Sequence, residues 1–274
     1  MEGLPTTLEV NAAVLLAMRV SGLVLVAPVF SSRAVSRQTK IVVICLFTVL
    51  LWPAATRAAA PGTAITAATF VTEWMVGIAL GLGAMILVAA AESAGDMLAI
   101  QIGLAGGNVI NPMSDNPVPV LGQLLGLFAV TMLLTTGGHL LMLDAFAATL
   151  DVVPPGSPLS LQEGAFAIVD LGSRLFLLGL RVAAPVIGAV MVGNVVLGVL
   201  ARTVPQLNVL MVAFPVQIGI GLLTIGVSMP LVASLYGEWP MLYEQVLESI
   251  VRGFTGQRPV DGAVPAFPIP VGGV

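Results

Sequence analysis

Six long apolar stretches, almost free of charge, dominate this sequence and restrict what it can fold into. A helix that crosses the roughly 30 Å hydrocarbon core of a bilayer needs about 20 mostly apolar residues. The chain has 10 basic and 14 acidic side chains, yet only Arg19 and Arg181 lie inside the stretches. This segregation of charge predicts helices in lipid or in a protein assembly at membrane depth. The stretches are Val10–Val29, Ile41–Ala55, Trp74–Ala91, Pro117–Leu143, Leu175–Leu200 and Leu210–Leu235.

The composition supports the same class of protein. Charged residues make up 9% of the chain and hydrophobic residues 58%, with a mean hydropathy of +1.06. So few charges cannot cover the surface of a water-soluble protein of this size. The net charge of −4 excludes a nucleic-acid binder, which needs clustered cations. We therefore expect an all-α membrane protein with about six hydrophobic helices arranged as kinked hairpins.

Two of the stretches need a closer interpretation. Ile41–Ala55 is short and contains Pro53, so a kinked or partial hairpin and a clean span both fit. The first stretch follows Glu2 and Glu9 rather than basic residues, so it is interpreted as part of the fold and not as a cleaved signal peptide.

Basic residues in short loops predict the orientation of the helices. Arg33, Arg37 and Lys40 cluster after the first stretch, which places that loop in the cytoplasm. With six spans, both termini would then lie outside.

The segment Gly103–Pro119 combines glycines and prolines with apolar side chains, which is unusual for a solvated loop. The glycines and prolines prevent a long helix. A plain connector between helices and a re-entrant or pore-facing loop are both consistent with this composition.

The C-terminal segment Trp239–Arg252 has an apolar face at helical spacing and a mostly acidic opposite face. An acidic face disfavours anionic lipid, so we expect this helix to dock against protein. Glu248 and Arg252 form a favourable pair at i, i+4. Residues 1–256 are interpreted as one membrane-embedded domain, and residues 257–274, rich in proline and glycine, as a disordered tail.

The residues favour neither catalysis nor ion-coupled transport. His139 is the single histidine, and phosphate-binding and dinucleotide-binding motifs are missing, so no metal, cofactor or enzyme activity is expected. No carboxylate lies inside a stretch, which disfavours an ion-coupled solute transporter. The candidate intramembrane charges are Arg19 and Arg181, inside stretches, and Glu73, which borders the third stretch, and we hypothesise that Arg19 pairs with Glu73. Glycines four residues apart, such as Gly77 and Gly81, indicate close helix packing.

The segment from Arg202 to Gln217 reads Arg-Thr-Val-Pro-Gln-Leu-Asn-Val-Leu-Met-Val-Ala-Phe-Pro-Val-Gln and resembles the signature of the flagellar biosynthetic protein FliR family, the T-type export-gate subunit of type III secretion. Further pieces agree with this family in order along the chain. They are Arg19–Leu23 with Ala27–Arg33, Glu73 with Gly77–Gly83, Gly137–His139, and Phe176–Asn194 leading to Arg202.

The resemblance implies a core subunit of the flagellar export gate, in the basal body of the bacterial inner membrane. Its partners would be P-type, Q-type and B-type gate subunits together with membrane lipid, and its substrates unfolded exported proteins. An injectisome T-type subunit is the alternative within the class, and an ion-coupled small-solute transporter is the alternative outside it.

The resemblance also implies two sets of functional residues. A loop between the middle hairpins would plug the pore, and its apolar members would block ions by excluding water. The mapped plug residues are Leu104, Gly106, Gly107, Val109, Ile110, Pro112 and Met113. A second set is interpreted either as a turn between hairpin arms or as a subunit contact, and it comprises Arg202, Pro205, Gln206, Leu207 and Asn208.

Overall fold

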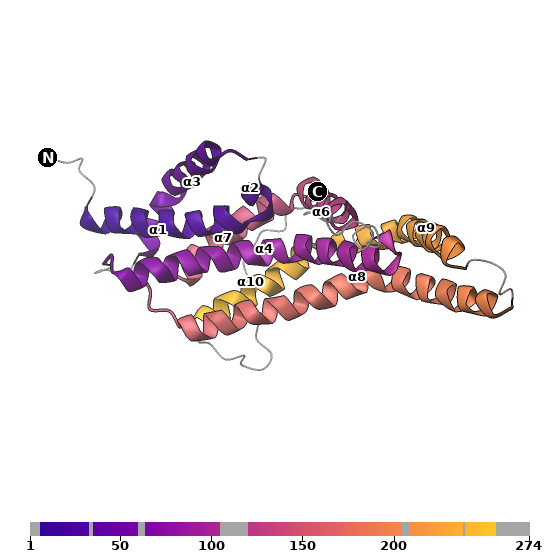
Figure 1. Ribbon diagram of the computed structural model, residues 1–274. Helices are drawn as coiled ribbons and strands as arrows, with labels where there is room; N and C mark the ends of the chain where they lie inside the picture. Colours follow the sequence, from indigo (N-terminus) through magenta and orange to yellow (C-terminus); the bar gives the residue numbers. More distant parts are fainter. Residues whose placement is uncertain are drawn as a thin grey trace, which may run out of the picture. The chain divides into compact units, whose positions relative to one another are not determined.

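The computed structural model describes residues 6–32, 35–59, 64–104, 120–203, 209–237 and 239–255, and within these ranges the regular structure is helical, without strands. Five described helices are long and apolar enough to cross a membrane, and a broken pair supplies a sixth candidate. The expected all-α membrane protein is therefore confirmed. The helices labelled in Figure 1 are α1 (Thr7–Val26), α2 (Pro28–Ser31), α3 (Arg37–Ala58), α4 (Ala67–Gln101), α6 (Val120–Thr135), α7 (Gly138–Val152), α8 (Leu161–Thr203), α9 (Val209–Gly237) and α10 (Trp239–Thr255).

Local chemistry explains where the first helices begin. At the start of α1, the Glu9 amide donates to Thr6 Oγ1 at 3.3 Å and the Thr6 amide donates to Glu9 Oε2 at 2.8 Å. This reciprocal capping box satisfies two amides that lack partners in the helix. The first apolar stretch does not continue unbroken to Val29, because α1 ends at Val26 and Pro28 opens the short α2. Proline fits the first helical turn, where its missing N–H would have no partner within the helix.

Two other apolar stretches form helices whose bounds differ from those of the stretches themselves. Ile41–Ala55 is the middle of a helix of 22 residues, and Pro53 lies inside it. The chain therefore forms a clean helix here rather than a partial hairpin. Pro117–Leu143 is not one helix: within it, α6 and α7 are separated at Thr136 and Gly137, where Gly137 has φ 75°. Glycine adopts this left-handed conformation without the penalty of a side chain.

The chain divides into two compact units. The first contains residues 1–86, 134–172 and 239–274, and in it α3 packs against α1 and α7. The amphipathic α10 docks on this unit: Tyr243 Oη donates to the carbonyl of Leu80 at 3.4 Å, and Leu247 and Ile250 are fully buried. The expected docking against protein is confirmed, as is the pair Glu248–Arg252 at 3.7 Å.

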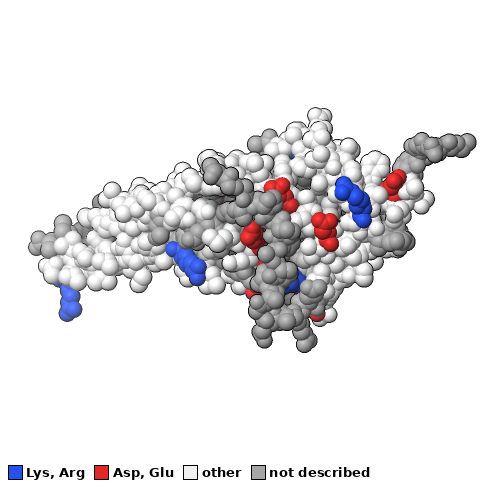
Figure 2. Space-filling view, turned by 180° about the vertical axis from the view of Figure 1, so that it is seen from behind, with Lys and Arg blue, Asp and Glu red and all other residues white. Residues whose placement is uncertain are grey.

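The second unit contains residues 87–133 and 173–238. Its α8 segment and α9 form an antiparallel hairpin, because Gly193 lies against Ile220 and Asn194 bonds Gln217 (Figure 1). Charged side chains are few and scattered on the molecular face in Figure 2, as the composition requires. The hairpin exposes large apolar side chains, among them Met191, Val192, Val195, Val196, Val199, Leu222, Leu223 and Val227.

The interpretation of residues 1–256 as one domain stays a prediction, and the tail 257–274 lies outside the described residues.

Candidate functional site

A buried ion pair occupies the first unit. Arg19 Nε of α1 donates to Glu73 Oε2 of α4 at 2.6 Å, and both residues have no exposed surface. The pairing hypothesised from the sequence is therefore present in the structure. A charge this deep is stable only when it is paired and hydrogen-bonded, because removing an ion from water is strongly unfavourable.

The same pair holds a third segment of the chain. Arg19 Nη2 donates to the carbonyl of Val153 at 2.9 Å, and Glu73 Oε1 accepts from the amide of Gly156 at 2.8 Å. Both backbone groups lie in the connection between α7 and α8. The two side chains thus tie α1, α4 and this connection together, and we call them the ion-pair staple.

Glycines allow the two helices to approach closely enough for the staple to form. A Cβ added at Gly22 would lie 2.5 Å from the carbonyl oxygen of Trp74, and one added at Gly77 would collide with the carbonyl of Arg19. Gly81 packs on α1 as well, against Leu23. The predicted role of the Gly77 and Gly81 spacing in close packing is confirmed.

A hydrogen bond between two amide side chains joins two apolar helices in the second unit. Gln217 Nε2 of α9 donates to Asn194 Oδ1 of α8 at 2.6 Å. Gly103, at the end of α4, has φ 79° and lies against Phe214 and Gln217. Sequence reasoning did not single out Asn194 or Gln217 as a pair, although the signal was an isolated amide side chain in each of two facing apolar stretches. Such amides in membrane helices commonly hydrogen-bond across a helix interface.

Two carboxylates of α4 face glycines of α6 in the same unit. Glu92 lies against Gly126 and Asp96 against Gly122, so this glycine pair makes room for acidic side chains as well as for the α4 backbone. Glu92 lies beyond the candidate span Ala67–Ile86. Burial, and then the nearby charge of Asp96, raise the pKa of Glu92 above its ordinary value of 4.5.

We expect Glu92→Gln to stabilise the protein at neutral pH. The raised pKa means that the folded state disfavours ionised Glu92, so stability falls as pH rises through the pKa of the folded state and the penalty is full above it. As the pH falls below about 4.5 the carboxyl becomes protonated in both states, and the difference between Glu92→Gln and the wild type should shrink toward zero.

Thermal unfolding in detergent at pH 8 and pH 4 measures this effect, and an Asp96→Asn background is the control. The gain should stay below about 1 kcal/mol, because the carboxylate is partly exposed, and it should shrink without the charge of Asp96. If Glu92→Gln were less stable than the wild type by the same amount at both pH values, the raised pKa of Glu92 would be contradicted.

The remaining predicted site residues are only partly described. Leu104 is exposed, whereas Gly106, Gly107, Val109, Ile110, Pro112 and Met113 lie outside the described residues. Arg181 and Arg202 are exposed on α8, and both lie inside the candidate span Phe176–Thr203, so the interpretation of Arg181 as an intramembrane charge stays a prediction. Pro205, Gln206, Leu207 and Asn208 also lie outside the described residues. Among the residues that are described, no group of three His, Cys, Asp or Glu side chains could hold a metal ion.

Comparison with known proteins decides the family. A model of the family described as "Bacterial export proteins, family 1" matches residues 10–239. The chain belongs to this family. The matched region includes the ion-pair staple and the Asn194–Gln217 bond, and it ends where α10 begins.

Similar proteins carry the name flagellar biosynthetic protein FliR. The protein of that name from Escherichia coli (strain K12) is 30% identical over 223 residues, which cover 79% of this chain and 83% of that protein. The one from Pectobacterium carotovorum subsp. carotovorum is 29% identical over 216 residues, 78% of this chain and 83% of its own length. The one from Bacillus subtilis (strain 168) is 29% identical over 163 residues, 58% of this chain and 63% of its own length. The predicted membership in the FliR family is confirmed, and with the apolar helices it identifies a multi-pass membrane protein of flagellar protein export.

Proposed function

We propose that this protein is a non-enzymatic core subunit of the flagellar type III export gate, where it forms part of the channel for unfolded flagellar proteins. The observation that carries the proposal is the family match over residues 10–239, together with relatives named FliR over most of their own length. These names favour the flagellar gate over an injectisome.

The exposure of apolar side chains is consistent with a subunit of a larger membrane assembly. In the second unit, side chains such as Val195, Leu223 and Val227 are more than half exposed on α8 and α9. In the proposed gate, P-type, Q-type and B-type subunits and lipid of the inner membrane would cover these surfaces. Arg202 and the segment 205–208 would contact a neighbouring subunit or form the turn between α8 and α9.

We propose that Leu104 and the segment 106–113 plug the channel in the resting gate. The described part of this region is its beginning, where Gly103 leaves α4 in a left-handed conformation and lies against Phe214 and Gln217. Apolar side chains in a narrow pore exclude water and thereby ions. Val109, Ile110 and Met113 would supply this block, and Gly106, Gly107 and Pro112 would shape the loop.

Deleting residues 106–113 should raise ion conductance through the assembled gate while leaving assembly intact. Single-channel recording of the purified complex in planar bilayers measures the conductance, and co-purification of the partner subunits measures assembly. The control is a deletion of equal length at residues 259–266, beyond the family match. An assembled deletion complex that is as tight to ions as the wild type would refute the plug.

Secretion in cells tests the function itself. Deleting the gene should abolish export of flagellar filament protein to the medium, and the wild-type chain should restore it. Normal flagellar export in the deletion strain, with loss of secretion by an injectisome, would show that the alternative T-type assignment holds.

A further inference from the structure

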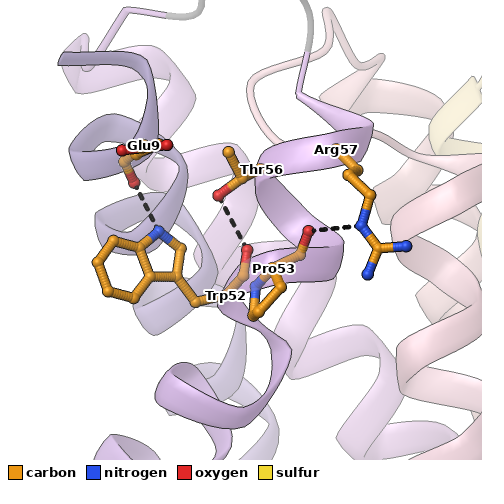
Figure 3. Close-up of a pocket in the computed structure, with 5 residues that line it drawn as sticks. All are labelled: Glu9, Trp52, Pro53, Thr56 and Arg57. Atoms are coloured by element: carbon orange, nitrogen blue, oxygen red, sulfur yellow. Dashed lines mark hydrogen bonds between the residues drawn. The ribbon is translucent and has the colours of Figure 1, made fainter. Parts of the chain in front are cut away.

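A pocket of about 320 Å³ lies where the end of α3 meets the first turn of α1 in the first unit (Figure 3). Its walls are formed by Glu9, Trp52, Pro53, Thr56 and Arg57. One wall thus carries an anionic side chain and another a cationic one, and Trp52 adds an indole ring on the side of Glu9.

Hydrogen bonds fix the pocket's polar groups in place. Trp52 Nε1 donates to the Glu9 carbonyl at 3.1 Å, which joins α3 to α1. Arg57 Nε donates to the Pro53 carbonyl at 3.1 Å, and Figure 3 shows the terminal nitrogens of the guanidinium pointing away from that bond. The Glu9 carboxylate is positioned by the capping box of α1. The pocket is therefore organised before any ligand enters.

An exposed apolar face of α3 leads to this pocket. Val42, Leu46, Val49 and Leu50 are each more than 60% exposed. Residues seven apart share a helix face, so Pro53 continues the row of Leu46 and Arg57 continues the row of Leu50. The apolar face consequently ends in a cation at the pocket.

The length and burial of α3 match a helix that meets lipid. Its 22 residues correspond to about 33 Å, close to the thickness of a bilayer core. Ala55 is its single buried residue in the described structure. Tryptophan and arginine near a helix end lie at the level of lipid headgroups, where the indole is half in hydrocarbon and the guanidinium reaches phosphate.

We propose that this pocket binds the headgroup of an aminophospholipid, with the acyl chains lying along the exposed face of α3. Arg57 binds the phosphate, because a guanidinium donates two parallel hydrogen bonds to phosphate oxygens. Glu9 binds the ammonium group, and Trp52 contacts the glycerol region. The combination of both charges in one pocket selects a zwitterionic aminolipid over an anionic one.

Lipid retention by the purified, assembled complex tests the proposal. The complex is placed in nanodiscs of equal parts phosphatidylethanolamine and phosphatidylglycerol, extracted into mild detergent, and its bound lipid is counted by native mass spectrometry. Glu9→Gln preserves the capping box, which accepts glutamine at this position. Arg57→Gln and Glu9→Gln should each reduce retained phosphatidylethanolamine about fivefold, the effect of losing one partly exposed charge contact. Arg37→Gln, at the other end of α3, is the control and should retain lipid as the wild type does.

A second measurement separates lipid from a protein occupant. A spin label at Leu50→Cys in a Cys45→Ser background reports accessibility to oxygen, which partitions into lipid, and to a water-soluble nickel complex. High oxygen and low nickel accessibility in the assembled complex is expected. A label shielded from both reagents would show that a partner subunit covers the face and would overturn the proposal, as would equal lipid retention by the wild type and Arg57→Gln.

Discussion

Arg19→Gln should lower the free energy of unfolding by about 3–5 kcal/mol, because it leaves Glu73 as an uncompensated buried charge. Arg19 and Glu73 have no exposed surface, and their bond is 2.6 Å long. The substitution also removes the donor to the Val153 carbonyl. Calorimetry of the purified protein in detergent measures the loss as a fall in Tm.

A double-mutant cycle with Glu73→Gln tests whether the two residues act together. The double variant should be less destabilised than the sum of the single variants, by about 1–3 kcal/mol, because neither partner is left charged alone. Arg252→Gln is the matched control: its pair with Glu248 is 3.7 Å long and partly exposed, so its loss should change stability by under about 1 kcal/mol. Strictly additive effects at Arg19 and Glu73 would disprove the ion-pair staple.

Gly77→Ala is the second substitution with a large expected effect. Its Cβ would collide with the carbonyl of Arg19, which is backbone and cannot swing aside. The two helices would have to separate, which moves Arg19 away from Glu73. We expect a destabilisation of about 3 kcal/mol, at the upper end of the usual penalty for overpacking.

Gly172→Ala provides a control of opposite sign. Gly172 lies within α8, and no atom lies within 4 Å of where its Cβ would be. Alanine is favoured over glycine in a helix by up to about 1 kcal/mol, so this variant should be neutral or slightly stabilised. Equal Tm values for Gly77→Ala and Gly172→Ala would rule out the close approach of α1 and α4.

Several features of the fold could be predicted from the sequence because they depend on the free energy of transferring individual side chains from water to an apolar environment. The apolar stretches mark the helices, since lipid and protein interiors both exclude charge. The amphipathic face of α10 predicted its burial, and Tyr243 and Leu247 are indeed buried. Arg19 and Glu73 could be paired because they were the opposite charges near the early spans.

Helix ends were harder to predict because hydropathy does not report where a backbone stops hydrogen bonding. α4 continues through Glu92 and Asp96 to Gln101, and α8 begins at Leu161, well before its apolar part. Pro53 is accommodated inside α3, whereas Gly137 interrupts an apolar run through its left-handed φ. Hydropathy alone therefore placed neither the end of α4, nor the start of α8, nor the break at Gly137.

The candidate site likewise contains residues that the sequence predicted and contacts that it did not predict. Intramembrane charge is rare, so Arg19 and Glu73 stood out. The Asn194–Gln217 bond joins two neighbouring helices, and its recognition required the register of α8 against α9. The facing of Glu92 with Gly126 likewise depends on how α4 crosses α6. The role of residues 106–113 and 205–208 stays a prediction.

Identification of the proteins that co-purify with the full-length chain in mild detergent tests the export-gate assignment most directly. We expect a stable complex with several small membrane proteins encoded among flagellar genes, recovered equally with the Arg252→Gln control. A lone chain that catalyses solute uptake when reconstituted into vesicles would contradict it.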